Sequence, residues 1–182
     1  MGEQRANLRK PPPVAVRPSP SDPRQGVIRF GAVTLRCALG KGGISAFKRE
    51  GDGAAPLGRM SILGGYLRRD KRFAAPNRLD LRAIRATDGW CDAASDRNYN
   101  RPVRLPYATS AETMRRNDSL YDICLVLDWN IRPRRRGAGS AIFFHLARPG
   151  YLPTEGCIAV SRRDMARLLP FLTKRSAVIV RR

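Results

Sequence analysis

The segment LYDICLVLDW, residues 120–129, is an apolar run that predicts a buried β-strand. A basic turn follows at Pro133 and at the glycine-rich residues 137–139. The next apolar run, SAIFFHL at residues 140–146, predicts a second strand that leads into a turn at Pro149. Two apolar strands joined by a turn indicate that the folded part of this chain consists mainly of β-structure.

Segments on both sides extend this pattern. Residues 27–37 alternate in polarity and predict one half-buried strand. The sequence GKGG at residues 40–43 predicts a turn, and the glycines between residues 51 and 65 separate short segments as in a domain with tight turns. Residues 176–180 predict a closing strand. None of these segments alternates with helices in the manner of a parallel α/β sheet.

Two short helices are expected. The first covers residues 110–116 and is capped by Ser110. The second begins after Ser161, where Asp164 completes an acidic capping box, and Pro170 should kink or end it. We therefore expect a mainly β fold, a β-sandwich or open barrel of mixed but largely antiparallel strands with a few short helices.

The composition limits the number of domains and suggests partners. The 182 residues include 35 Lys and Arg against 15 Asp and Glu, a net charge of +20. This length fits one domain at residues 27–182, and the basic, proline-rich residues 1–26 predict a flexible tail. A surface of this charge attracts polyanions, so a basic binding module for nucleic acid or an anionic wall polymer is one alternative function. Nucleic acid is the less expected partner, because the few aromatic residues do not interleave with the basic runs.

The cysteines are far apart in the sequence, and His145 is the only histidine. No C-x-x-C pair is present, so a zinc site is not expected. Cys37 and Cys124 lie in apolar segments and should be buried, whereas disulfides among Cys37, Cys91 and Cys124 stay an open question.

No apolar run is long enough to span a membrane, and the first ten residues lack the hydrophobic core of a secretory signal.

Cys157 and His145 are the clearest candidates for catalytic residues. Cys157 follows Gly156 in the segment PTEGCI, residues 153–158, shortly after the histidine. A thiol and an imidazole suffice for acyl transfer, because the imidazole can deprotonate the thiol and later protonate the leaving amine. Glycine allows a tight turn in which backbone N–H groups hold the oxyanion. The nearby helix start and arginines should lower the thiol pKa. The alternative is a core histidine beside an inert buried cysteine.

Residues 37–160 resemble the catalytic domain of the L,D-transpeptidase (YkuD-like) family. That family places a histidine upstream of an [ST]-H-G-C-[IVL] signature, and His145 and the segment TEGCI at residues 154–158 are similar to this pattern. Further similar segments are REGDGAAPLG at 49–58, GWCD at 89–92 and NYNR at 98–101.

The resemblance implies a β-rich fold and acyl transfer on peptidoglycan stem peptides. Cys157 would attack the amide carbonyl of the third stem residue and expel D-alanine, and an amine of a second stem would resolve the thioester into a cross-link. His145 would be the general base and acid, oriented by the Leu146 carbonyl, while Gly156 would help to hold the oxyanion. No metal or cofactor is expected. The candidates for substrate binding are Thr154, Arg148, Tyr151 and Tyr99.

The chain departs from the family pattern around the cysteine. Glu155 stands where the family usually has histidine, and the gap after His145 is shorter than usual. Ala159 replaces an arginine that meets the substrate carboxylate in many members. Arg148 or the nearby Arg162 and Arg163 are candidate substitutes. The donor position and the acceptor stay open, and water as acceptor would give an L,D-carboxypeptidase. The resemblance implies a periplasmic or cell-envelope location, and the oligomeric state is not determined by the sequence.

Overall fold

The computed structural model describes residues 11–73 and 75–182. The strands are β1 (Val14–Pro18), β2 (Gln25–Phe30), β3 (Val33–Ala38), β4 (Ile44–Ser45), β5 (Ala55–Pro56), β6 (Gly58–Leu67), β7 (Leu81–Ala83), β8 (Asp88–Cys91), β9 (Arg101–Arg104), β10 (Ala111–Thr113), β11 (Ile123–Leu127), β12 (Phe143–Leu146), β13 (Ile158–Val160) and β14 (Ala177–Val180). The helices are α1 (Arg162–Leu168) and the short 3-10 segments η1 (Pro149–Tyr151) and η2 (Leu169–Phe171). No helix among these described residues has the length and apolar character needed to cross a membrane.

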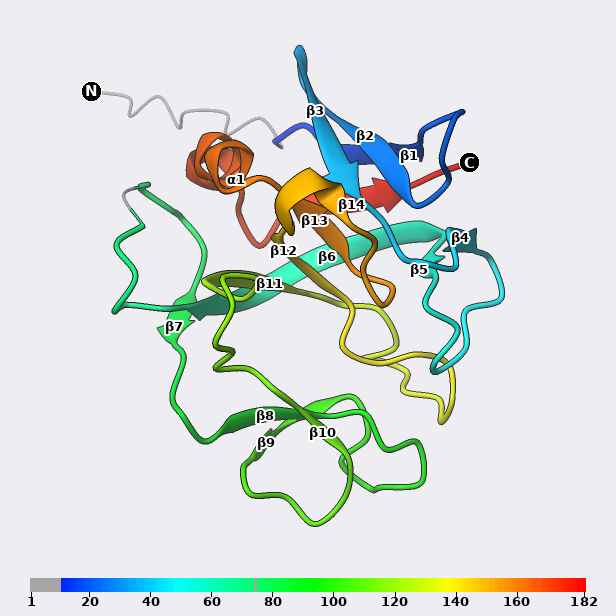
Figure 1. Cartoon of the computed structure of the whole chain (residues 1–182), viewed down its shortest axis with the longest axis vertical. Helices are drawn as coiled ribbons and strands as arrows, with labels where there is room; N and C mark the ends of the chain where they lie inside the picture. Colours follow the sequence, from blue (N-terminus) through cyan, green and yellow to red (C-terminus); the bar gives the residue numbers. More distant parts are fainter. Residues whose placement is uncertain (1–10, 74) are drawn as a thin grey trace, which may run out of the picture.

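Nine strands form one sheet in the order β11-β12-β13-β3-β2-β1-β14-β6-β7. This sheet closes into a barrel because β6 pairs with β14 through one half and with β11 through the other. β6 can do so because it is ten residues long, and it crosses the middle of Figure 1. Within this sheet, β1–β14, β12–β13 and β6–β7 are the parallel pairs and the rest are antiparallel. The expected mainly β, mostly antiparallel fold is confirmed.

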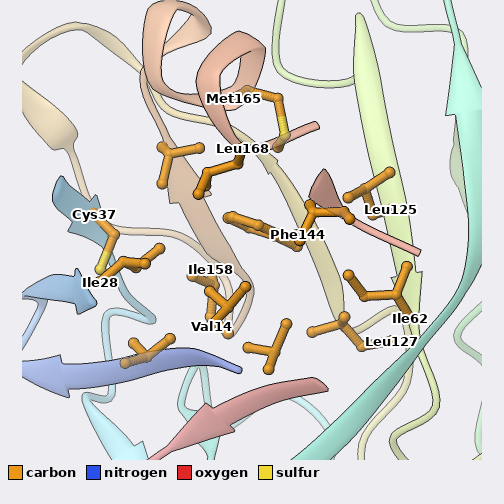
Figure 2. Packing of buried hydrophobic residues seen from close by; sticks show 14 of the residues in the cluster. Val14, Ile28, Cys37, Ile62, Leu125, Leu127, Phe144, Ile158, Met165 and Leu168 are labelled. Carbon is orange, nitrogen blue, oxygen red and sulfur yellow. The ribbon is translucent and has the colours of Figure 1, made fainter. Parts of the chain in front are cut away.

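Alternating side chains divide the barrel strands between two apolar clusters. On β11, Leu125 points into the main core and Cys124 points to the other side. On β12, Phe144 enters the main core and Phe143 joins the second cluster. Figure 2 shows Phe144 packed in the main core close to Leu125 and Ile158. Because strand side chains alternate between the two faces, every second residue of β12 and β13 faces away from this core.

A separate three-stranded sheet, in the order β10-β8-β9, covers that other face. It lies at the end of the molecule opposite α1 (Figure 1). Trp90 of β8 meets Phe143 of β12 edge to face, with ring centroids 5.2 Å apart. The second cluster also contains Met114 and Tyr121, which come from the segment that links this sheet to β11. Thus the small sheet is fixed over the outer face of β11 and β12.

The prediction of a flexible tail is wrong for its C-terminal part. β1 lies between β2 and β14, and its side chains Val14 and Val16 have no exposed surface. The sequence pattern did not predict this strand, because its alternation of buried and exposed residues is short and lies among prolines. Pro18 stands at the strand end, where proline is tolerated. The part of the predicted tail at residues 1–10 lies outside the described residues.

Two other predicted elements also differ. Residues 110–116 do not form a helix, because residues 111–113 are strand β10, paired with β8. Residues 27–37 are not one strand but belong to a hairpin, in which β2 turns into β3 at Gly31 with φ 58°. In both places the partner strand, and not the local pattern, determines the backbone.

Other predictions are confirmed. Ser161 caps α1 by accepting a hydrogen bond from the Asp164 N–H at 3.1 Å, and α1 ends before Pro170. Strands lie at the expected places near residues 120–129, 140–146 and 176–180. All four cysteines are buried and free, which answers the open question about disulfides.

We predict that Val16→Ala lowers the free energy of unfolding by about 2 kcal/mol, because two buried methyl groups are lost and a cavity remains. Val27→Ala is the matched control, since Val27 on β2 is 41 % exposed and should change stability by less than about 0.5 kcal/mol. Urea unfolding followed by tryptophan fluorescence measures both. Equal effects of the two substitutions would show that β1 is not part of the folded domain.

Candidate active site

Cys157 and His145 are carried by two adjacent parallel strands. β12 pairs with β13 so that His145 lies opposite Ala159, and Cys157 comes directly before β13. Their neighbours Phe144 and Ile158 point into the main core. Since side chains alternate along a strand, His145 and Cys157 both project from the opposite face, beneath the small sheet.

Both side chains line one cavity of about 330 Å³. The Tyr121 ring stands edge-on to the His145 ring, with centroids 5.2 Å apart, and forms part of the same wall. The other lining residues are Glu50, Asp92, Glu112, Arg116, Leu120, Ser140, Ala141, Arg148, Leu152, Pro153, Thr154, Glu155 and Ala159. The cavity is therefore bounded by the loops next to β12 and β13 and by residues near the small sheet.

The Cys157 thiol is buried and protonated. Its Sγ donates to the Ala141 carbonyl at 3.2 Å and accepts from the Phe143 N–H at 3.3 Å. Burial raises the pKa of Cys157 to about 12, and the Glu112 carboxylate adds to this effect. The expectation of a lowered pKa is wrong, because the thiol is shielded from water and α1 begins only after β13.

The His145 ring is held in one tautomer. Its Nδ1 lies 2.8 Å from the Leu146 carbonyl oxygen, which can only accept, so Nδ1 carries the hydrogen and Nε2 is the basic nitrogen. Burial lowers the pKa of His145 to about 4. No hydrogen bond joins this ring to the Cys157 thiol within the described part of the chain. At neutral pH the site thus holds a neutral thiol and a neutral imidazole.

The loop before Cys157 is fixed by its own hydrogen bonds. Thr154 Oγ1 donates to the Cys157 carbonyl at 2.7 Å and accepts from the Gly156 N–H at 3.2 Å. Gly156 has φ 121°, and a Cβ there would lie 2.8 Å from the Ala54 carbonyl oxygen, so glycine is required. The Gly156 N–H, a candidate for the oxyanion, is engaged by Thr154 in this state.

The structure separates the four candidates for substrate binding. Thr154 and Arg148 line the cavity, and Arg148 is exposed without an ion pair among the described residues. Tyr151 does not line the cavity, and its ring is covered by the Arg36 guanidinium at 4.6 Å from the centroid. Tyr99 is 1 % exposed and donates its hydroxyl hydrogen to Glu50. The two tyrosines are therefore not brought to the cavity.

The positions that depart from the family pattern have distinct surroundings. The Glu155 side chain is 77 % exposed and forms an ion pair with Lys41 at 2.7 Å. Ala159 is buried at the cavity wall, so no cation stands there. Arg148 is the exposed cation closest in sequence to His145 among the lining residues.

Sequence reasoning missed several lining residues. Glu112 accepts a hydrogen bond from the Tyr121 hydroxyl at 2.5 Å, and burial raises the pKa of Glu112 in spite of that bond. Burial and the nearby Cys157 also raise the pKa of Tyr121 well above its ordinary value. No local signal marks these residues, because Glu112 lies in a segment whose pattern predicts a helix and Tyr121 reads as a core residue.

This arrangement suits acyl transfer by a thiol that loses its proton only during attack. A neutral imidazole with free Nε2 can accept that proton and return it to the leaving group. Within the described residues there is no group of three His, Cys, Asp or Glu side chains placed to hold a metal ion. Cys157 and His145 are a candidate nucleophile and a candidate base that line the same cavity.

We predict that His145 makes the protein sensitive to acid. Its pKa is about 4 when folded and about 6.5 when unfolded, so the unfolded chain is protonated first as the pH falls. The stability contribution is complete above about pH 6.5 and is lost as the pH falls to about 4, a total of about 3 kcal/mol. Urea unfolding at several pH values measures this loss.

His145→Gln is the matched variant for that measurement, because glutamine can still donate to the Leu146 carbonyl but does not titrate. As the pH falls from 6.5 to 4, the wild type should lose stability relative to the variant. A difference that is independent of pH would contradict a buried neutral imidazole.

Comparison with known proteins identifies the family of this chain. Neither the search of curated proteins nor that of solved structures gave a match. The family model described as the L,D-transpeptidase catalytic domain matches residues 24–180, nearly the whole chain, and includes both His145 and Cys157. The chain therefore belongs to the YkuD family of L,D-transpeptidase catalytic domains.

Proposed function

We propose that this protein is a cysteine-dependent L,D-transpeptidase that joins peptidoglycan stem peptides through a Cys157 thioester. The single observation that carries the proposal is that His145 on β12 and Cys157 directly before β13 line one cavity, with Nδ1 of His145 held by the Leu146 carbonyl. The family acts on peptidoglycan, and its members are typically associated with the cell envelope. We place the activity of this chain there as well.

In the first half of the reaction, Cys157 Sγ attacks the amide carbonyl of the donor stem. Because both groups are neutral, the thiol proton passes to His145 Nε2 as the carbon–sulfur bond forms. The imidazolium then protonates the leaving amine, which is the amino group of a terminal D-amino acid. The Leu146 carbonyl keeps Nδ1 protonated throughout, so it orients the ring and stabilises the cation that forms briefly.

Arg148 is the residue that we assign to the donor carboxylate. It is exposed, it lines the cavity, and no described acidic side chain pairs with it. A guanidinium can bind a carboxylate through two parallel hydrogen bonds. It would thereby replace the arginine that many members carry at the position of Ala159. Thr154 is expected to act indirectly, by fixing the loop that carries Cys157.

In the second half, an amine of another stem attacks the thioester and forms the cross-link. Water in place of the amine would make the protein an L,D-carboxypeptidase. We favour the amine because the lining of the cavity is rich in carboxylates, which attract a cationic group.

We predict that a carbapenem forms a covalent adduct with this protein, seen as one added mass in the intact protein. Cys157→Ala should abolish both the adduct and turnover. Cys37→Ala is the control, because Cys37 is also a buried free thiol but packs in the main core. An adduct that persists in Cys157→Ala would refute the assignment of the nucleophile.

We further predict that His145→Gln slows formation of the carbapenem adduct by roughly 100-fold or more, as expected for loss of a general base. In the variant the rate should rise about tenfold per pH unit and reach no plateau up to pH 9, because a thiol with a pKa of about 12 stays mostly protonated over this range. Time-resolved mass spectrometry measures this rate. A plateau below pH 9 would contradict a buried thiol with a strongly raised pKa.

A further inference from the structure

The charge of the cavity is opposite to that of the protein. The whole chain carries a net charge of +20. Four acidic and two basic side chains line the cavity around Cys157, namely Glu50, Asp92, Glu112, Glu155, Arg116 and Arg148. The lining thus has more acidic than basic residues although the protein as a whole is strongly basic. Such a cavity favours a cationic occupant.

The cations of the cavity neutralise its inner carboxylates only in part. Arg116 is bound to Asp118 at 2.7 Å and is 3.8 Å from Glu112. Arg148 is exposed and forms no ion pair with a described residue. The carboxylate of Asp92 has no hydrogen-bond or ion-pair partner within residues 11–73 and 75–182. The Asp92 carboxylate thus lies at the cavity without a neighbouring cation, and Glu112 has only the distant, shared guanidinium of Arg116.

Two buried polar atoms of the lining also lack partners. Asp92 Oδ1 and Ser140 Oγ are shielded from water and have no hydrogen bond within the described residues. Ser140 is only 7 % exposed, and it directly precedes Ala141, whose carbonyl accepts the Cys157 thiol hydrogen. Leaving such atoms unpaired costs stability, and a ligand that donates hydrogen bonds would remove that cost.

The two inner carboxylates come from the small sheet. Asp92 follows β8, Glu112 lies on β10, and the Asp92 N–H donates to the Ser110 carbonyl across these two strands at 3.3 Å. Asp92 is close enough to raise the pKa of Glu112, and Glu112 is close enough to raise the pKa of Cys157. The small sheet therefore holds two carboxylates near the nucleophile.

We propose that Asp92, Glu112 and Ser140 form the acceptor subsite, which binds the side-chain ammonium of a diamino acid next to the Cys157 thioester. An alkyl ammonium has three N–H donors and no acceptor, which suits two carboxylates and a hydroxyl. This inference rests on the proposed function and assigns specificity in its second half-reaction to residues of the small sheet. Arg148 and the donor carboxylate would occupy the other, exposed side.

The chemistry of that half-reaction explains why carboxylates are useful. The amine nitrogen bonds to the thioester carbon, and the carbon–sulfur bond breaks with its electron pair passing to Sγ. An ammonium loses two protons as it becomes an amide. One proton reaches Sγ by way of His145 Nε2, and the other leaves through the carboxylates to water. His145 alone accounts for only the first of these transfers.

The test compares the two half-reactions in the full chain. We expect Asp92→Asn, Glu112→Gln and the double variant to form the carbapenem adduct at rates within about twofold of wild type. Formation of cross-linked dimer from disaccharide-tetrapeptide should fall at least tenfold in the double variant, with a higher KM for the acceptor, as for loss of hydrogen bonds to a charged group. The rate at which water hydrolyses the thioester and releases the tripeptide product should not fall, because this reaction does not use the acceptor amine.

Asp80→Asn is the control for the change in net charge. Its side chain is 80 % exposed, pairs with Lys174 at 3.5 Å, and does not line the cavity. It should leave dimer formation unchanged. Equal losses in adduct and dimer formation in the double variant, or no loss of dimer, would overturn the acceptor subsite.

A competition experiment on the wild type covers the case in which a variant does not fold. A guanidinium analogue of the acceptor side chain, which keeps the positive charge and the N–H donors but is a poor nucleophile, should inhibit dimer formation without slowing the carbapenem adduct, whereas a neutral urea analogue of similar shape should not inhibit. Equal inhibition by both analogues would reject recognition of a cation. If the wild type forms no carbapenem adduct, the proposed function itself fails, which is a separate outcome.

Discussion

The parallel pairing of β12 with β13 is the constraint on which the site depends. It sets His145 opposite Ala159 and puts Phe144 and Ile158 into the main core. With those two residues buried inside, His145 and Cys157 must face the other way. A shift of this register by one residue would move the imidazole or the thiol to the core face. Packing of the barrel therefore fixes the geometry of the chemistry.

Burial then decides how the pair works. Both groups lie out of water, so burial raises the thiol pKa to about 12 and lowers the imidazole pKa to about 4. Such a pair holds no reactive thiolate, and in the proposed mechanism the proton moves only when a substrate is in place. The Leu146 carbonyl, at 2.8 Å from Nδ1, does the orienting that a carboxylate performs in other catalytic sites.

The small sheet gives the cavity its charge. It is fixed to the barrel by the Trp90 and Phe143 rings, and it carries Asp92 and Glu112 toward the thiol. Its contribution was not visible in the sequence. The segment at residues 110–116 has the cap and polarity of a helix, but pairing with β8 makes residues 111–113 a strand. Glu112 is turned toward Tyr121 only as a result of that pairing.

The sequence by itself determined the fold class and the capped helix after Ser161, and it singled out the two residues that we propose as nucleophile and base. These follow from local periodicity, capping and residue type, which need no distant partner. Only the tertiary structure decided that Val14 and Val16 are core residues, that the thiol pKa is raised, and that Tyr99 and Tyr151 lie away from the cavity. The physical reason is that burial, charge environment and strand pairing depend on residues far apart in the chain, which a local pattern does not contain.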